Sequence, residues 1–295
     1  MVGLELEDAR AIAVRIDDRG GVEARATVAS DGDLAAAAER AIADVAGAAH
    51  GARELGIAAA VPDAPAIAAA VAALSGRVGG LAQHGIAPSG TAAAVAEAWI
   101  GAARGVHDVV YFACGDHTIG GVVRAGAPVG GARGRAGSVA WLALNPVERE
   151  DYRKAGCLEA EVAAAGIVRR LVWRVKAGDR SRVADAVNGD YAAITVQHVL
   201  DAARERDGVS ISVIRDTAKY LGMAAANLVV IVDPEMLVLG GIMASAADLL
   251  LDALRAEIAR RLPKATFDAL KIQAAALGDE AAAIGAARLA SAALR

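Results

Sequence analysis

A neighbouring acid and imidazole, Asp116 and His117, are the residues of this chain whose types most directly allow chemistry. A carboxylate beside a histidine can orient the ring for proton transfer, and histidine titrates near neutral pH. Such a pair is more often a loop contact without a catalytic role. Glycines flank the pair at Gly115 and at Gly120-Gly121, so the segment is expected to be a loop between two strands.

Two hydroxyl residues, Ser89 and Thr91, precede an apolar-periodic run that predicts a helix over 92–104. Side chains of this type commonly accept hydrogen bonds from the first backbone N–H groups of a helix, so we expect Ser89 and Thr91 to be capping residues. A serine nucleophile needs a neighbouring base, and nothing in the sequence places a histidine beside Ser89.

The composition describes a globular protein. Of the 295 residues, 56% are apolar and 22% are charged, and only 3% are aromatic, so aliphatic cores are expected. A formal charge of −4 gives no general attraction for nucleic acid. No apolar stretch is long enough to span a bilayer, and the N-terminus carries no basic leader. We expect a cytoplasmic protein in which Cys114 and Cys157 are buried free thiols.

The elements that must position these residues alternate between strands and helices. Strands are predicted at 2–6, 11–17, 22–29, 55–61, 108–113, 121–125, 229–233, 236–240 and 270–276. Helices are predicted at 33–52, 66–76, 92–104, across most of 158–227, and at 246–261 and 279–293, with a connector or short strand at 77–87. Each half opens with strands and then adds helices, a pattern that predicts an α/β protein with two lobes and a cleft between them.

Four segments carry a family resemblance: 92–105 with the later Gly120-Gly121, 156–159 (GCLE), 227–241 (NLVVIVDPEMLVLGG) and the closing helix from Gly278. Together they resemble the ROK family of repressors, open reading frames and sugar kinases, which includes glucokinase-like members. The resemblance covers nearly the whole chain. It implies two ribonuclease H-like lobes of the actin/hexokinase-like ATPase superfamily around a central cleft. The N-terminal lobe would be 1–107, completed by helix 278–295, and the C-terminal lobe 108–277.

The same resemblance shows which functional groups of the family are replaced. The family's DIGGTK phosphate hairpin corresponds to residues 5–10 (ELEDAR), so Glu7 and Asp8 stand where glycines let the backbone approach phosphates. Like charges about 4 Å apart repel by roughly 1 kcal/mol in water and by more in a cleft. Ser89 stands at the place of the family's catalytic Asp. A hydroxyl cannot take that role near neutral pH, and Asp116 is the substitute base that we can name.

The remaining family motifs are partly kept. Candidate nucleotide contacts are the residues of the second phosphate loop and of the later glycine pair: Gly115, Thr118, Gly120, Gly121, Gly240 and Gly241. The family's sugar-contacting Glu and zinc-binding His correspond to Ser138 and Trp141, and only Cys157 remains of the cysteine set. One thiol cannot supply a tetrahedral zinc site, so no zinc is expected. Trp141 and Tyr152 are expected to fill the vacated space.

These replacements predict a catalytically degenerate sugar-kinase-like protein, a pseudokinase with a ligand-binding or regulatory role. The alternative is an active ATP-dependent kinase of glucose or an N-acyl hexosamine, with ATP–Mg²⁺ bound in an altered site. A third hypothesis is an assembly role, as a homodimer or as the partner of an active paralogue. A small sugar-like ligand is expected. Because Met1 leads directly into the first strand, the winged-helix DNA-binding domain of the family's repressors is not expected. No membrane contact is expected either, because no apolar stretch is long enough to span a bilayer.

Overall fold

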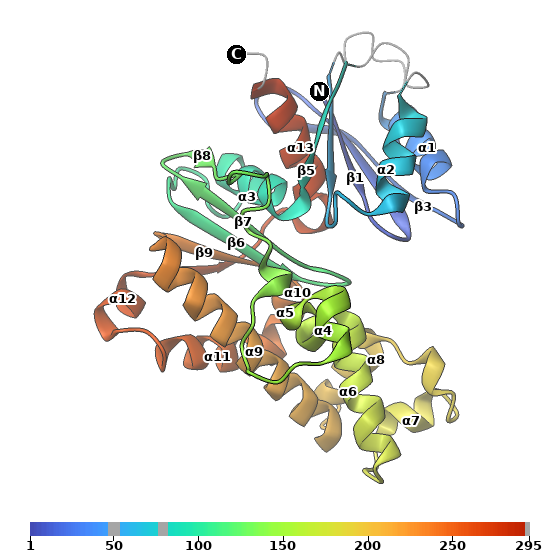
Figure 1. Ribbon diagram of the computed structural model, residues 1–295, viewed down its shortest axis with the longest axis vertical. Helices are drawn as coiled ribbons and strands as arrows, with labels where there is room; N and C mark the ends of the chain where they lie inside the picture. The colour runs from blue at the N-terminus through green and yellow to red at the C-terminus, as the bar shows by residue number, and fades with distance from the viewer. Residues whose placement is uncertain (47–53, 76–81, 293–295) are drawn as a thin grey trace.

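The computed structural model describes residues 1–46, 54–75 and 82–292, and two mixed sheets organise this part of the chain (Figure 1). The first sheet has the strand order β3-β2-β1-β4-β5, and the second has the order β10-β9-β6-β7-β8. The strands are β1 (Val2–Leu6), β2 (Arg10–Ile16), β3 (Val22–Ala29), β4 (Glu54–Ala59), β5 (Ala82–Pro88), β6 (Val109–Cys114), β7 (Thr118–Arg124), β8 (Ala127–Pro128), β9 (Met236–Gly241) and β10 (Lys271–Ala274).

The two sheets share a local plan. In the first, β1 pairs antiparallel with β2 and parallel with β4. In the second, β6 pairs antiparallel with β7 and parallel with β9. The predicted α/β class with strands opening each half is therefore confirmed. The lobe boundaries at 107–108 and 277–278 stay a prediction.

Helices cover the sheets and form a separate helical region between β8 and β9 (Figure 1). They are α1 (Leu34–Ala46), α2 (Pro65–Leu74), α3 (Ser89–Trp99), α4 (Glu150–Ala155), α5 (Cys157–Val162), α6 (Ala164–Lys176), α7 (Arg182–Ala186), α8 (Val196–Arg204), α9 (Gly208–Val232), α10 (Ile242–Ser245), α11 (Ala247–Ala259), α12 (Lys264–Ala269) and α13 (Ala281–Ala292), with short 3-10 turns η1 (Val139–Trp141), η2 (Tyr191–Ala193) and η3 (Gly278–Glu280). No helix in the described ranges is long and apolar enough to cross a membrane.

The closing helix α13 packs against the first sheet so closely that the backbones of the two elements are in contact (Figure 1). The two are far apart in the sequence. A Cβ atom on Gly3 of β1 would lie 1.8 Å from the carbonyl oxygen of Ala283, and one on Gly56 of β4 would lie 1.9 Å from that of Ala286. On the other side of α13, a Cβ on Gly285 would lie 1.7 Å from the carbonyl oxygen of Ala92 in α3. Small residues at these contacts let α13 approach both β1 and α3, and the alanine-rich composition serves this packing.

The predicted strand at 229–233 is wrong, because these residues form the last turn of α9, which ends at Val232. The run of β-branched residues resembles a buried strand, but Leu228 and Val229 are buried while Val230 and Ile231 are 65% and 75% exposed. One face of the helix packs and the other meets solvent, so tertiary packing overrides the strand propensity.

The other predicted elements are found with shifted ends. The helix predicted from 92 begins at Ser89, and the strand predicted at 121–125 is β7 from Thr118 to Arg124. The connector or short strand predicted at 77–87 contains most of β5. Parts of four predicted segments lie outside the described residues: 47–52, 76, 77–81 and 293–295.

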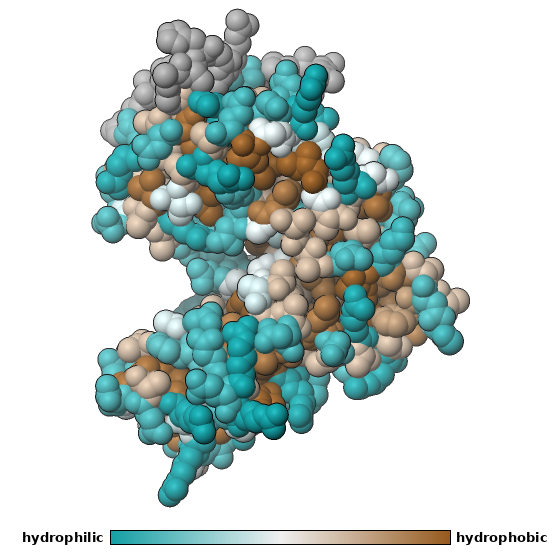
Figure 2. All heavy atoms as spheres, turned by 180° about the vertical axis from the view of Figure 1, so that it is seen from behind, coloured by the Kyte–Doolittle hydropathy of each residue, from teal (hydrophilic) through white to brown (hydrophobic). Residues whose placement is uncertain are grey.

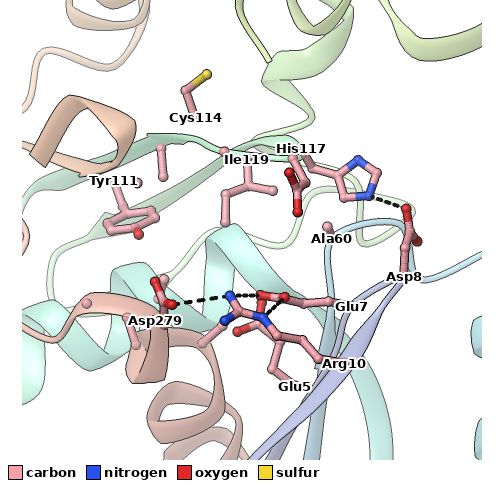
Figure 3. Close-up of a pocket in the computed structure, with 18 residues that line it drawn as sticks. Glu5, Glu7, Asp8, Arg10, Ala60, Tyr111, Cys114, His117, Ile119 and Asp279 are labelled. Atoms are coloured by element: carbon pink, nitrogen blue, oxygen red, sulfur yellow. Dashed lines mark hydrogen bonds and ion pairs between the residues drawn. The ribbon is translucent and has the colours of Figure 1, made fainter. Parts of the chain in front are cut away.

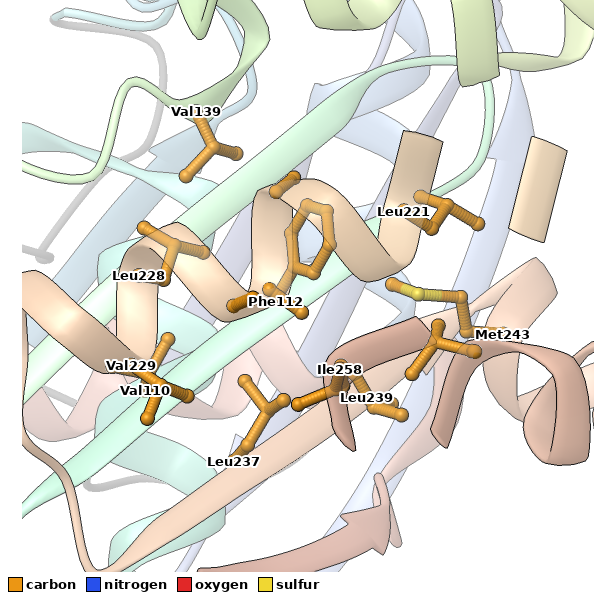
Figure 4. Packing of buried hydrophobic residues seen from close by; sticks show 14 of the residues in the cluster. Val110, Phe112, Val139, Leu221, Leu228, Val229, Leu237, Leu239, Met243 and Ile258 are labelled. Carbon is orange, nitrogen blue, oxygen red and sulfur yellow. The ribbon is translucent and has the colours of Figure 1, made fainter. Parts of the chain in front are cut away.

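The core of the second sheet is aliphatic, as the composition predicts. It lies between the sheet and helices α9 and α11 (Figure 4). Phe112 of β6 is fully buried at its centre, in one cluster with Leu221 of α9, Leu239 of β9 and Met243. This core fixes β6 and β9, whose carboxyl ends reach the candidate site.

Candidate functional site

A cleft between the two sheets hollows the molecular surface (Figure 2) and contains a cavity of about 380 Å³, which we call the cleft cavity. Its walls come from the β1–β2 turn, the carboxyl ends of β4, β6 and β9, and the segment that leads into α13 (Figure 3). Open α/β sheets bind ligands outside the carboxyl ends of their strands. The fold therefore provides a ligand-sized space where such a site is expected.

The charged side chains of the β1–β2 turn pair with one another and with the start of α13. The Arg10 guanidinium forms an ion pair with Glu7, and its Nη2 lies 3.2 Å from Oδ2 of Asp279 (Figure 3). The Glu7 backbone N–H donates to the Arg10 carbonyl at 3.0 Å, which closes the turn. The only cation of this turn is thus already neutralised by two carboxylates. Sequence reasoning missed Asp279, whose one signal is its place just before the closing helix.

Glu5 is a buried carboxyl group at the centre of the first sheet, with 6% of its surface exposed. It lies on the same face of β1 as Gly3, two residues earlier, which is the face that meets α13. Burial raises the pKa of Glu5 to about 8, and the neighbouring Ser89 hydroxyl partly offsets that increase. Glu5 is therefore mostly protonated and neutral at pH 7.

Ser89 is fully buried at the first position of α3, and its Oγ makes no hydrogen bond of normal geometry within the described residues. The Thr91 hydroxyl is likewise buried without a partner. The predicted capping role is wrong for both, because Pro88 is the N-cap residue and makes no side-chain cap. Ser89 and Thr91 lie inside the first turn, beyond the N-cap position whose side chain usually satisfies the free amides.

His117 links the two halves of the molecule. Its Nε2 lies 3.1 Å from Oδ2 of Asp8 in the β1–β2 turn, and its Nδ1 lies 3.2 Å from Oε1 of Glu159 on α5. The other Glu159 oxygen accepts from the Thr118 backbone N–H at 2.8 Å. The hydrogen bond to Glu159, with the charge of Asp8, raises the pKa of His117 to about 9. Both ring nitrogens are therefore protonated at neutral pH and donate to carboxylates.

The side chains of Asp116 and His117 do not form the acid–base pair that their adjacency suggested. His117 is bound by Asp8 and Glu159, whereas Asp116 is exposed on the cavity wall. The Asp116 carboxylate takes part in no hydrogen bond or ion pair within the described chain. His117 therefore makes loop contacts with residues distant in sequence. Glu159 was missed as its partner, because the two are 42 residues apart in sequence.

The candidate nucleotide contacts divide into residues that line the cavities and residues that are packed closely against neighbouring protein atoms. Gly115 and Gly241 line the cleft cavity, and a Cβ on Gly115 would meet nothing within 4 Å. A Cβ on Gly121 would lie 2.1 Å from the carbonyl oxygen of Gly90 in α3, and one on Gly240 would lie 2.3 Å from the Tyr111 hydroxyl. Glycine is thus required by packing at 121 and 240, whether or not a nucleotide binds.

A second space, the outer cavity, adjoins the first and has a volume of about 520 Å³. Both spaces share His117 and Ile119 in their walls, and Thr118 and Gly120 line the outer cavity. Across its mouth, Arg135 forms an ion pair with Asp63, which joins the loop after β4 to the loop after β8. The Ser138 hydroxyl donates to the Arg135 carbonyl at 2.7 Å, so its proton is already used and only its oxygen could accept from a ligand.

The residues at the place of the family's zinc motif behave differently from one another. Tyr152 is buried as predicted, and its hydroxyl donates to Glu161. The packing role predicted for Trp141 is wrong, because the residue is 56% exposed and lines the outer cavity. Cys114 is a buried free thiol, whereas Cys157 is free and only half-buried. Within the described ranges, no group of three or more His, Cys, Asp and Glu side chains is arranged to hold a metal ion.

Comparisons with known proteins relate the chain to sugar kinases and repressors. The family model described as the ROK family matches residues 86–293. A glucokinase from Halalkalibacterium halodurans is 32% identical over 197 residues, which are 65% of this chain and 59% of the relative. A xylose repressor from Caldicellulosiruptor bescii is 32% identical over 200 residues, which are 66% of this chain and 48% of the relative. The chain therefore spans about half to three fifths of the lengths of these relatives.

Solved structures match over nearly the full length. A ROK family glucokinase from Streptomyces griseus in complex with glucose and AMPPNP has a TM-score of 0.81 and 24% identity, with 99% of both chains covered. A ROK hexokinase from Thermus thermophilus has a TM-score of 0.71 and 24% identity, covering 100% of this chain and 99% of the other. At this identity the likeness establishes the fold, which is the predicted actin/hexokinase-like fold.

Proposed function

Because the chain belongs to the ROK family, we propose that it uses the sugar-kinase fold as a ligand-binding or regulatory protein without sugar-kinase activity. The observation that carries this proposal is the state of Ser89, which the resemblance puts at the place of the catalytic base. Its hydroxyl is fully buried beside the Glu5 carboxyl, whose pKa is raised to about 8. A hydroxyl and a protonated carboxyl group cannot accept the proton of an attacking sugar hydroxyl at pH 7.

The charge of the cleft cavity also supports this proposal. Its lining has the carboxyl groups of Glu5, Glu7, Asp8, Asp116 and Asp279. The two cations among the lining residues, Arg10 and His117, are each held by two carboxylates. A triphosphate would meet mainly negative charge, and each unit-charge repulsion at 4 Å costs about 4 kcal/mol at an effective dielectric constant near 20.

The outer cavity supports the binding of a small sugar-like ligand. It combines an exposed aromatic ring, Trp141, with polar groups from Glu159 and Lys154. A concave space with an aromatic wall and a few polar groups is typical of small-molecule sites.

We also propose a homodimer, since ROK proteins commonly dimerise. Light scattering at micromolar concentration tests this, and a monomer would contradict it.

The alternative is an active ATP-dependent kinase of glucose or an N-acyl hexosamine with an altered site. Two observations favour it: the Asp116 carboxylate is exposed on the wall of the cleft cavity, and the cavity is open beside Gly115. In this reading Asp116 would replace the missing base, and ATP–Mg²⁺ would lie across the retained glycines.

A coupled assay of ADP release distinguishes the two functions. The protein is incubated with ATP–Mg²⁺ and glucose, N-acetylglucosamine or N-acetylmannosamine. We expect no sugar-dependent ADP release, together with thermal stabilisation by at least one sugar in the absence of ATP. Sugar-dependent ADP release that Asp116→Asn abolishes would instead establish the active kinase. Asp18→Asn, in the exposed turn between β2 and β3 and outside both cavities, is the matched control for the loss of one exposed carboxylate.

A further inference from the structure

A third cavity, which we call the helical cavity, lies among the helices of the C-terminal half and has a volume of about 520 Å³. Helices α5, α6 and α9 and the segment before α4 form its walls. None of its lining residues lines the cleft cavity or the outer cavity. A ligand here would therefore contact none of the residues that line the site described above.

Arg170 of α6 lines this cavity, and the described residues do not satisfy all of its hydrogen-bond donors. Its Nη2 donates to Oγ1 of Thr217 at 2.5 Å, but its Nε and Nη1 are buried and have no acceptor in the described chain. No carboxylate of the described residues forms an ion pair with it. Burial lowers the pKa of Arg170, which reflects the cost of holding this cation away from water. Buried donors of this kind usually have a partner, often a water molecule or an ion.

The two carboxylates of the helical cavity are already committed to other cations. Glu161 accepts from Arg149 at 3.1 Å and from the Tyr152 hydroxyl, and Asp216 pairs with Lys219 at 3.1 Å. A fourth lining cation, Arg174, pairs with Asp179 outside the lining. The cavity thus has four cationic side chains and two carboxylates in its lining, and the positive charge of Arg170 is the one without a direct counter-ion.

An aromatic wall adjoins this charge. Trp173 is 50% exposed and lines the cavity one helical turn beyond Arg170. The guanidinium carbons of Arg149 and Arg169 lie 6.0 Å and 5.1 Å from its ring centroid. Leu144 and Met223 add apolar surface. A half-exposed ring held by two guanidinium groups, near a third guanidinium that forms no ion pair, suits a ligand that has a flat or apolar body and an oxyanion group.

We propose that the helical cavity binds a small organic anion, a carboxylate or phosphate monoester, whose oxyanion group is held by Arg170 and whose body lies against Trp173. Both candidate headgroups accept the planar donor set of a guanidinium. The proposal does not depend on whether the cleft phosphorylates sugars, because the two sites share no residue.

Binding is tested by calorimetry on the full chain with three probes: phenyl phosphate, benzoate and inorganic phosphate, with benzyl alcohol as the uncharged match. We expect phenyl phosphate or benzoate to bind and benzyl alcohol not to bind, and the stronger of the two identifies the headgroup. Arg170→Gln should weaken this binding by roughly 10- to 100-fold, the usual worth of a charge-assisted hydrogen bond. Arg182→Gln, which removes an exposed arginine paired with Glu205, should leave the affinity unchanged.

A second variant keeps the test valid if Arg170→Gln does not fold. Trp173→Ala changes a half-exposed side chain, and it should weaken phenyl phosphate or benzoate while leaving any weak binding of inorganic phosphate unchanged. Three results would overturn the proposal: no binding of any probe to the wild-type protein, equal binding of benzyl alcohol, or unchanged affinity in Arg170→Gln.

Discussion

The cleft cavity and the helical cavity use charged side chains in opposite ways. In the cleft, the cations Arg10 and His117 are each held by two carboxylates. In the helical cavity, Glu161 and Asp216 are already paired with other cations, and Arg170 forms no ion pair with any described residue. A glucokinase structure with this fold is a complex with glucose and AMPPNP, yet in this chain both cations that line the cleft cavity are paired with carboxylates. The position of a cavity in a fold therefore does not fix which ligands it favours, because the pairing of its charges does.

The largest expected effect is on stability and concerns Gly121, one of the retained glycines of the second phosphate loop. Gly121→Ala puts a methyl group 2.1 Å from the Gly90 carbonyl oxygen, where only backbone could move. We expect a loss of about 3 kcal/mol or more in the free energy of unfolding, measured by urea titration. Gly115→Ala, in open space, is the control and should change stability by less than about 0.5 kcal/mol. Equal stability of the two variants would return Gly121 to a ligand-binding role.

The acidic residues of the β1–β2 turn, Glu7 and Asp8, give the second-largest expected effect, which is on nucleotide affinity. Glu7→Gly with Asp8→Gly removes two negative charges from the cleft wall and frees Arg10 from its intrahairpin partner. If charge excludes nucleotide from the cleft, ATP–Mg²⁺ should bind roughly 100-fold more tightly, as calorimetry would measure. A control pair, Asp201→Asn with Glu205→Gln, removes the same charge from exposed sites on and just beyond α8. Equal gains in both variants would mean that net charge, and not the hairpin, limits binding.

Much of the fold could be predicted from the sequence, because strand and helix periods are local. The meander, β6, β9 and the closing helix all lie close to their predicted positions. The prediction for 229–233 was wrong for a physical reason. Val229 to Val232 favour a strand by their residue types, but the packing of α9 against the second sheet makes them helical. The replaced residues of the cleft were also visible in sequence, since each occupies a motif position.

The partners within the site could not be predicted in the same way. Glu159 and Asp8 reach His117 from 42 and 109 residues away, and Asp279 reaches Arg10 from 269 residues away. Nothing in the local sequence of Arg170 indicates that two of its nitrogens are buried without acceptors. These facts depend on how distant elements pack, so only the three-dimensional arrangement could reveal that the cleft cations are neutralised and that Arg170 is not.

The smallest expected effect is the pH dependence of the free energy of unfolding, which reports the strength of the His117 ion pairs. The folded-state pKa of His117 is raised to about 9, above its ordinary value of 6.5. Its stabilising effect is therefore complete below pH 6.5 and is lost as the pH rises through 9, because the folded state binds the extra proton. Comparison of wild type with His117→Gln should show a difference on the order of 2–3 kcal/mol at pH 6.5 that vanishes above pH 9.

A graded series identifies which contact holds the histidine. Glu159→Gln removes the partner with the larger influence on the His117 pKa, and Asp8→Asn removes the smaller one. The pH-dependent loss of stability should therefore shrink more in Glu159→Gln than in Asp8→Asn, as urea titrations between pH 6 and 9.5 would measure. Glu5, whose pKa is about 8, adds its own loss between pH 4.5 and 8, but it is present in every variant and cancels in the differences. If Asp8→Asn had the larger effect, the contact between the two halves would hold His117, and the cleft would be expected to open as the pH rises.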